Sequence, residues 1–125
     1  MTGVTLDAGA LIALDRDDRR VLLLVAGAAE RKMPITIPAT ALAQAIRLPA
    51  RQVHLSRLIR QPGVRLVPLD GPGATAVGRL LALTHTADIA DAHVVVCARR
   101  AEQPVVTTDG DDLRRLDPAL PLVEL

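Results

Sequence analysis

The segment "DIADAHVVVCARRAEQPVVTTDGDDLRRL", residues 88–116, decides the fold class. Its first part, residues 88–100, is apolar on nearly every side of a predicted helix, which indicates a helix buried in a core. The β-branched run that follows, "VVTT", predicts a short strand, and the acids and leucines after it predict another helix. A buried helix that leads into a strand and then directly into a helix is typical of a layered α/β protein.

The same alternation of strand and helix patterns extends over the whole chain. Strand patterns occur at residues 3–7, 33–38, 63–70 and 103–109, and residues 121–125 could add an edge strand. Helix patterns occupy residues 8–32, with a break near residues 15–18, and residues 39–47, 51–59, 71–85, 88–100 and the stretch up to 116. We therefore expect one domain over residues 1–125, in which helices cover both faces of a parallel sheet of about five strands.

The composition excludes several classes of protein. A formal net charge of +1 excludes a broadly cationic nucleic-acid coat, and the absence of aromatic residues excludes base stacking on rings. The single cysteine, Cys97, cannot form a disulfide framework or a thiolate metal site within one chain. The first residues carry no basic leader, and no apolar run approaches the length of a membrane span. We expect a soluble cytoplasmic protein with no membrane contact.

Aspartates gather at one predicted edge of the sheet. Asp7 ends the first strand, and Asp109 ends the fourth, with Asp112 about one helical turn further on. The helix 88–100 precedes the fourth strand and runs antiparallel to it, so Asp88 and Asp91 at its start belong to the same edge. Because sites in parallel sheets form at the carboxyl ends of the strands, these acids are candidates for a shared site.

Each of these acids also has a purely structural explanation. Asp88 with Asp91, and Asp109 with Asp112, have the spacing of a helix N-cap followed by an acid at the third position, and Asp7 could cap its own helix. Asp91, however, begins a helix that is apolar nearly all round, where a cap would be expected nearer to solvent. Converging carboxylates raise one another's pKa unless a cation lies between them, and oxygen ligands suit Mg²⁺ or Mn²⁺.

Four motifs along the chain resemble one known family. They are "LDAGALIAL" (6–14), "IPATALAQAIR" (37–47), "DIADAHVVVCAR" (88–99) and "VVTTDGDDLRRL" (105–116). In this order and at these intervals they resemble the PIN domain and, within it, the VapC toxins of bacterial toxin–antitoxin pairs. The resemblance covers nearly the whole chain. It implies a parallel sheet of about five strands flanked by helices, and a metal-dependent ribonuclease whose acidic cluster holds Mg²⁺ or Mn²⁺.

The resemblance assigns roles to individual residues. Asp7 matches the first acid of the family, Asp91 the acid that opens the long central helix, and Asp109 with Asp112 the last motif. Asp88 matches an extra acid that some members have, and Thr108 the small hydroxyl residue before the last acids, where it could bind a metal-bound water or cap the next helix. Asp7, Asp91 and Asp109 are then the principal metal ligands, Asp112 a water-bridged or orienting ligand, and Asp88 a secondary one.

Gln44 departs from the family pattern. The family usually has Glu at this position, so this chain lacks one formal negative charge there. The amide oxygen of Gln44 can still meet a hard cation, but it cannot neutralise charge or act as a base. Asp88, one turn before Asp91, could compensate for the lost charge.

The resemblance implies hydrolysis of RNA phosphodiester bonds by a metal-activated water. The alternative is a catalytically impaired PIN domain, disabled by Gln44, that binds RNA or an antitoxin without cutting. A homodimer and a cognate VapB-like antitoxin are the further partners implied. His93, two residues after Asp91, points to another helix face and is expected to serve packing or an interface. Six arginines are candidates for phosphate contacts or for solvated helix faces: Arg19, Arg20, Arg47, Arg51, Arg99 and Arg100.

Response regulators and aspartyl phosphatases also place Asp at the end of the first strand. The former need a lysine late in the chain, whereas the only lysine here is Lys32. The latter need a second Asp two residues on, and Gly9 stands there. Both classes are therefore set aside.

Overall fold

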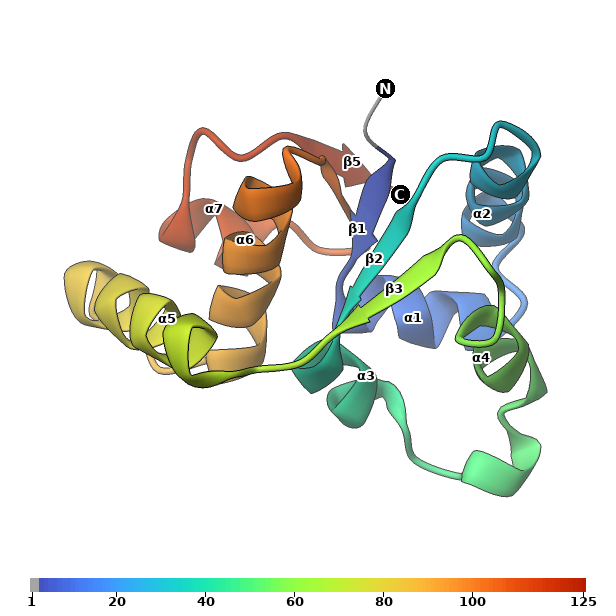
Figure 1. Cartoon of the computed structure of the whole chain (residues 1–125), viewed down its shortest axis with the longest axis horizontal. Helices are drawn as coiled ribbons and strands as arrows, with labels where there is room; N and C mark the ends of the chain where they lie inside the picture. Colours follow the sequence, from blue (N-terminus) through green and yellow to red (C-terminus); the bar gives the residue numbers. More distant parts are fainter. Residues whose placement is uncertain (1–2) are drawn as a thin grey trace.

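A five-stranded, all-parallel sheet forms the centre of the computed structural model, which describes residues 3–125 (Figure 1). The strands are β1 (Val4–Leu6), β2 (Ile35–Pro38), β3 (Val64–Val67), β4 (Val105–Thr107) and β5 (Leu122–Glu124). Their order across the sheet is β3-β2-β1-β4-β5, so β1 lies in the middle. In register, Thr5 of β1 lies opposite Thr36 of β2 and Val105 of β4. The predicted parallel sheet is confirmed.

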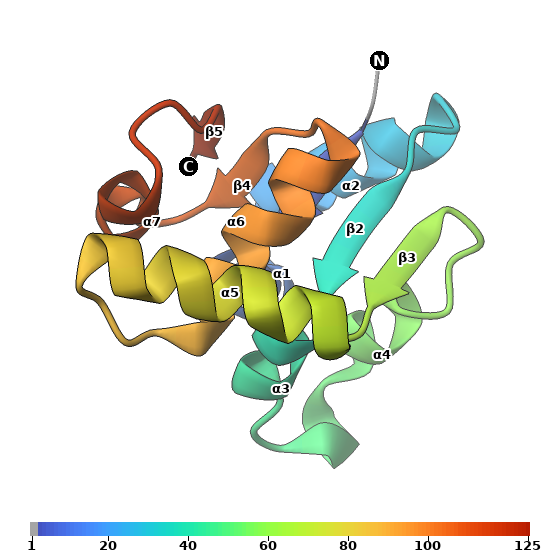
Figure 2. The same cartoon turned by 60° about the vertical axis from the view of Figure 1, so that its left-hand side comes forward.

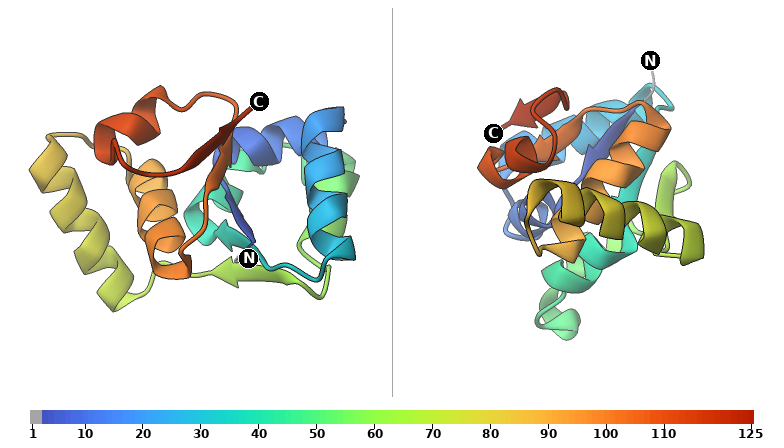
Figure 3. Two further views of the ribbon diagram at one scale, coloured as in Figure 1. Left: turned by 90° about the horizontal axis from the view of Figure 1, so that it is seen from above. Right: turned by 90° about the vertical axis from the view of Figure 1, so that its left-hand side faces the viewer.

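Helices cover both faces of this sheet. They are α1 (Ala8–Asp15), α2 (Arg19–Glu30), α3 (Ala39–Ala45), α4 (Val53–Leu58), α5 (Gly71–Thr84), α6 (Ile89–Ala101) and α7 (Asp111–Leu116), with a 3-10 turn η1 (Pro49–Arg51). Seen from above, α5, α6 and α7 lie on one side of the strands and α1, α2 and α4 on the other (Figure 3). Figure 2 shows α5 stacked outside α6, away from the sheet. The expected α/β fold with helices on both faces is therefore present.

The buried hydrophobic residues among residues 3–125 are all Leu, Ile, Val, Ala or Cys, and the chain has no Phe, Tyr or Trp. The stretch of α6 from Ala92 to Ala98 is buried on all sides, since α6 packs against α5, α3, α7 and three strands. Leu11 of α1 is fully buried under the sheet. The apolar pattern of residues 88–100 thus marks the central helix, as expected from a helix without a polar face.

The order of the strands creates a switch point between β1 and β4. From β1 the chain moves outward through β2 to β3, and then crosses back to add β4 and β5 on the other side. Where the direction of winding reverses, the loops after the two central strands separate and leave a crevice at their carboxyl ends. Asp7 follows β1 and Asp109 follows β4 by two residues, so both flank this crevice.

No single helix among residues 3–125 is long and apolar enough to cross a membrane. The pair α5 and α6 meets the length and composition criteria only jointly, and the two helices are bent by 112° at the break between them.

The tightness of the core gives a test of the fold. Leu11→Ala should destabilise the protein by about 2–5 kcal/mol, because it removes a fully buried side chain and leaves a cavity. Leu23→Ala on α2 is the matched control: Leu23 is 66% exposed, so its removal should change stability by no more than about 0.5 kcal/mol. Urea denaturation followed by circular dichroism measures both, and equal losses would contradict this packing.

Candidate active site

Asp7 is a buried carboxylate at the carboxyl end of the central strand. It is the N-cap of α1, and its Oδ1 accepts a hydrogen bond from the Ala10 amide at 2.8 Å. Its side chain is also hydrogen-bonded to Thr107. Burial raises the pKa of Asp7, and the nearby Asp109 raises it further, while the hydrogen bonds from Thr107 and Ala10 lower it. The expected cap is therefore present, and it holds a partly desolvated acid at the switch point.

Asp91 is the most perturbed acid of the site. Burial raises the pKa of Asp91 most, and the nearby charges of Asp88, Asp112 and Asp7 add to the effect, so that this pKa is about 6. Asp88 is the N-cap of α6, and its Oδ1 accepts a hydrogen bond from the Asp91 amide at 2.9 Å. Because Asp7, Asp88 and Asp112 all act electrostatically on Asp91, α1, α6 and α7 bring these acids close to Asp91.

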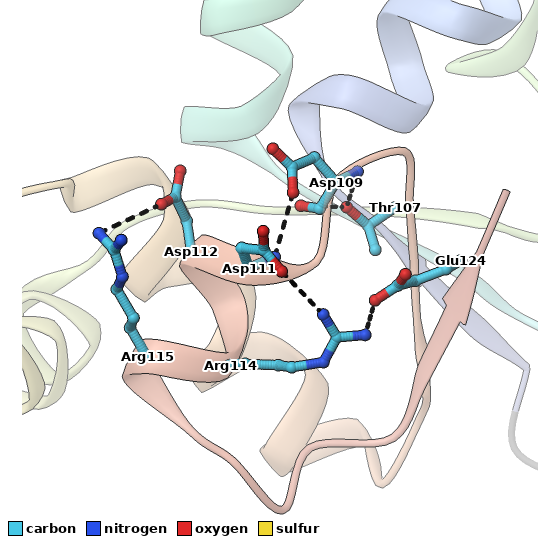
Figure 4. Close-up of polar contacts among 7 residues, drawn as sticks. All are labelled: Thr107, Asp109, Asp111, Asp112, Arg114, Arg115 and Glu124. Atoms are coloured by element: carbon cyan, nitrogen blue, oxygen red, sulfur yellow. Dashed lines mark hydrogen bonds and ion pairs between the residues drawn. The ribbon is translucent and has the colours of Figure 1, made fainter.

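The Thr107 side chain contacts the residues that follow both central strands, Asp7 after β1 and Asp109 after β4. Its hydroxyl accepts a hydrogen bond from the Asp109 amide at 3.1 Å and lies 3.0 Å from the Asp109 carbonyl oxygen (Figure 4). The same hydroxyl bonds to Asp7, so one fully buried group contacts both sides of the crevice. Thr108, not Thr107, is the hydroxyl residue that the family resemblance predicts for this site. The signal that could have identified Thr107 is its place as the last residue of β4, at the carboxyl end of a central strand where the site lies.

Arginines neutralise the outer acids of α7. Arg114 pairs with Asp111 at 3.1 Å and also contacts Glu124 of β5, while Arg115 lies 3.8 Å from Asp112 (Figure 4). Among the described residues, by contrast, no basic side chain forms an ion pair with the remaining acids of the cluster, which are Asp7, Asp88, Asp91 and Asp109. The inner acids therefore carry unbalanced charge, and Asp112 is partly compensated by Arg115.

The structure supports a capping role for Asp109 at the start of the last motif. Its Oδ1 accepts a hydrogen bond from the Asp111 amide at 3.2 Å, and Gly110, directly before α7, has helical dihedral angles and no side chain that could cap. Thr108 does not cap α7. Its hydroxyl lies close to the first turn of α1, since a Cβ atom added to Gly9 would come within 2.7 Å of it.

Gln44 lies at the same edge of the sheet but is not joined to the acids. It is exposed on α3, which starts directly after β2 and packs against α1 and α6. In the described part of the chain, no hydrogen bond connects Gln44 to any acid of the cluster. His93 is buried, and its Nδ1 lies 2.7 Å from the Thr40 hydroxyl, which agrees with the packing role expected for it.

The comparisons with known proteins identify the family. The family model described as "PIN domain" matches residues 4–118. The chain belongs to the PIN domain family. PIN domains are typically nucleases and typically depend on a metal ion.

Solved structures show the same PIN fold. A chain of FitAcB from Neisseria gonorrhoeae is 19% identical with a TM-score of 0.66, over 97% of this chain and 96% of that one. A chain of FitAB bound to an IR36 DNA fragment is 18% identical with a TM-score of 0.64, over 97% and 94% respectively. A comparison of this sequence with curated proteins found no match.

The acids of this PIN domain offer the oxygen ligands that a divalent cation prefers, but their side chains are not arranged around a single position. Within residues 3–125, no three Asp, Glu, His or Cys side chains are already placed to coordinate one ion together. The inner acids nevertheless supply only oxygen ligands, have no basic partners in the described residues, and have raised pKa values where they are buried. Carboxylates that repel one another without a cation are expected to stand apart and to approach when it binds.

The raised pKa of Asp91 predicts a pH dependence of the metal-free protein. Between about pH 4 and pH 6 the folded state holds this proton more tightly than the unfolded chain, so ionisation destabilises the fold as the pH rises. Asp91→Asn should therefore gain stability over the wild type across this range, and the gain should level off above it. Urea denaturation in EDTA measures this.

Glu30→Gln is the control for that measurement, because Glu30 is exposed on α2, away from the cluster. It should show no gain that grows with pH. A difference between Asp91→Asn and wild type that stays constant from pH 4 to pH 7 would contradict the raised pKa.

Proposed function

We propose that this chain is a metal-dependent ribonuclease of the VapC-like toxin type, which hydrolyses RNA phosphodiester bonds with a water activated by Mg²⁺ or Mn²⁺. One observation carries the proposal: Asp7 and Asp91, from different elements, are both withdrawn from solvent at the switch point without a basic partner in the described residues. Such an arrangement costs folding free energy unless a cation balances it, and costly charge is typical of functional sites.

Each residue of the cluster has its own role in this proposal. Asp7, Asp91 and Asp109 hold the ion as principal ligands, and Asp112 orients a water or bridges through one. Asp88 and Gln44 are secondary ligands, and Thr108, beside Gly9, is an auxiliary residue of the site. Thr107 keeps the Asp7 carboxylate and the Asp109 backbone in fixed relation. The bound cation would lower the pKa of a water molecule and screen the charge that develops on phosphorus.

A catalytically impaired PIN domain that binds RNA or an antitoxin is the second candidate. Gln44 supports it, because this chain lacks the carboxylate that the family usually has on that helix. The wider partners of the proposal are a cognate VapB-like antitoxin and a second copy of this chain, in the cytoplasm. The fold similarity to FitB, a PIN toxin of the FitAB toxin–antitoxin system, supports a toxin–antitoxin context.

Cleavage separates the two candidates. Structured RNA incubated with wild type and Mg²⁺ or Mn²⁺ should be cut, and Asp7→Asn should cut more than about 100-fold more slowly, because even groups behind metal ligands typically contribute 10–100-fold. Product formation on denaturing gels is the measurement. No cleavage by wild type, together with activity in Gln44→Glu, would instead establish the impaired form.

Metal affinity tests whether Asp88 compensates for Gln44. Mn²⁺ titrations followed by calorimetry should show weaker binding for Asp88→Asn and a larger loss for Asp91→Asn, since Asp88 is exposed and Asp91 is half-buried. Glu30→Gln on α2 should bind Mn²⁺ as wild type does. If Asp88→Asn leaves the affinity unchanged while Asp91→Asn abolishes it, Asp88 does not compensate.

A further inference from the structure

A basic pocket lies at the opposite end of α1 from Asp7. Arg16 at the end of α1, Arg47 after α3 and Arg51 of η1 line a cavity of about 250 Å³ together with Asp15. Three guanidinium groups and one carboxylate give the pocket a net charge of about +2. A cavity that gathers positive charge from three separate elements is suited to an anion.

The arginines of this pocket are not used by the fold. Elsewhere, Arg20 pairs with Asp18 and Arg99 pairs with Asp117. In the described part of the chain, none of the three pocket arginines forms an ion pair, and the one hydrogen bond from their side chains goes from Arg47 to the Ile46 carbonyl at 2.9 Å. Their charge is therefore available to a ligand.

Asp15 leaves that charge available although it lines the same cavity. Its Oδ1 is buried and makes no hydrogen bond within residues 3–125. The carboxylate therefore weakens the attraction of the pocket for an anion without occupying the arginines.

The pocket is preorganised by Gln52, which is only 9% exposed. Gln52 donates from Nε2 to the Ala45 carbonyl at 2.9 Å. Its Oε1 accepts hydrogen bonds from the amides of Arg47 at 2.9 Å and Leu48 at 3.2 Å. One buried side chain thus fixes the chain between α3 and η1 that positions Arg47 and Arg51. Fixing this backbone before binding lowers the entropy lost when a ligand arrives, although the exposed guanidinium groups themselves are not held by Gln52.

The pocket and the acidic cluster lie at opposite ends of α1. α1 extends from Asp7 across the carboxyl end of the sheet toward α4 (Figure 1), and its length separates Asp7 from Arg16 by about 13 Å along the axis. A few nucleotides of a single strand span that distance.

We propose that Arg16, Arg47 and Arg51 form a subsite for a backbone phosphate of the nucleic-acid substrate, a few nucleotides away from the acidic cluster. The subsite rests on the proposed function, because the acids determine which bond of the strand is cut. Phosphate contacts of this kind position a strand without reading its sequence.

Strand binding tests the subsite without requiring cleavage. In the Asp7→Asn background, fluorescence anisotropy measures the affinity for a labelled single-stranded RNA at several salt concentrations. R47Q/R51Q should weaken binding by about tenfold and reduce the slope of log K against log salt by about 0.7, because the contact with one phosphate is lost. Asp15→Asn should tighten binding several-fold, since it removes a negative charge from the pocket.

R31Q/R79Q is the matched control. It removes the same charge from α5 and the end of α2, at arginines that form no ion pair among the described residues. Circular dichroism confirms that each variant is folded. An equal loss of affinity in R31Q/R79Q and R47Q/R51Q overturns the subsite, as does weaker binding by Asp15→Asn or no binding of RNA at all. A DNA strand of the same sequence that shows the same losses supports recognition of the backbone phosphate.

The two proposals fail separately. Cleavage is measured with the wild-type protein, whereas the subsite is measured by binding alone in the Asp7→Asn background. Absence of cleavage together with binding that depends on the pocket refutes the ribonuclease and keeps the subsite. Cleavage together with equal affinities for the pocket and control variants refutes only the subsite.

Discussion

The mutual repulsion of carboxylates at one rim of a parallel sheet is the constraint on which this molecule depends. The strand order places Asp7 and Asp109 on either side of the switch point, and α6 enters the same rim with Asp88 and Asp91 at its start. An apolar helix and a closely packed core keep water from part of this cluster, so each negative charge affects its neighbours strongly. A divalent cation would relieve both the repulsion and the loss of hydration.

Helix capping and ligand placement are the same structural feature in this protein. Asp7 and Asp88 each accept a hydrogen bond from an amide three residues later, which fixes the direction of the carboxylate and begins the helix. In a helix that begins at the protein surface, such a cap would have no further role. These two helices begin instead at the crevice of the sheet, so satisfying their first amides also brings two acids to the same place.

The fold could be predicted from the sequence because its signals are local. The apolar run of α6, the break after Asp15 and the Asp at the end of β1 each determine one element, and the carboxyl-edge rule then brings the acids together. Thr107 was missed because its importance depends on which way the last side chain of β4 faces. The pairing of Asp112 with Arg115 and the grouping of Arg16 with Arg47 depend on rotamers and on contacts between elements, which residue spacing does not specify.

The short, capped helix α1 has a geometric consequence for the substrate. It is anchored by Asp7 at one end and carries Arg16 at the other, and an α-helix of this length is too stiff to change that separation appreciably. The helix would then set a constant distance between the two points at which a nucleic-acid strand is bound. The number of nucleotides between the bound phosphate and the cleaved bond would therefore be the same for every target, whatever bases the strand contains.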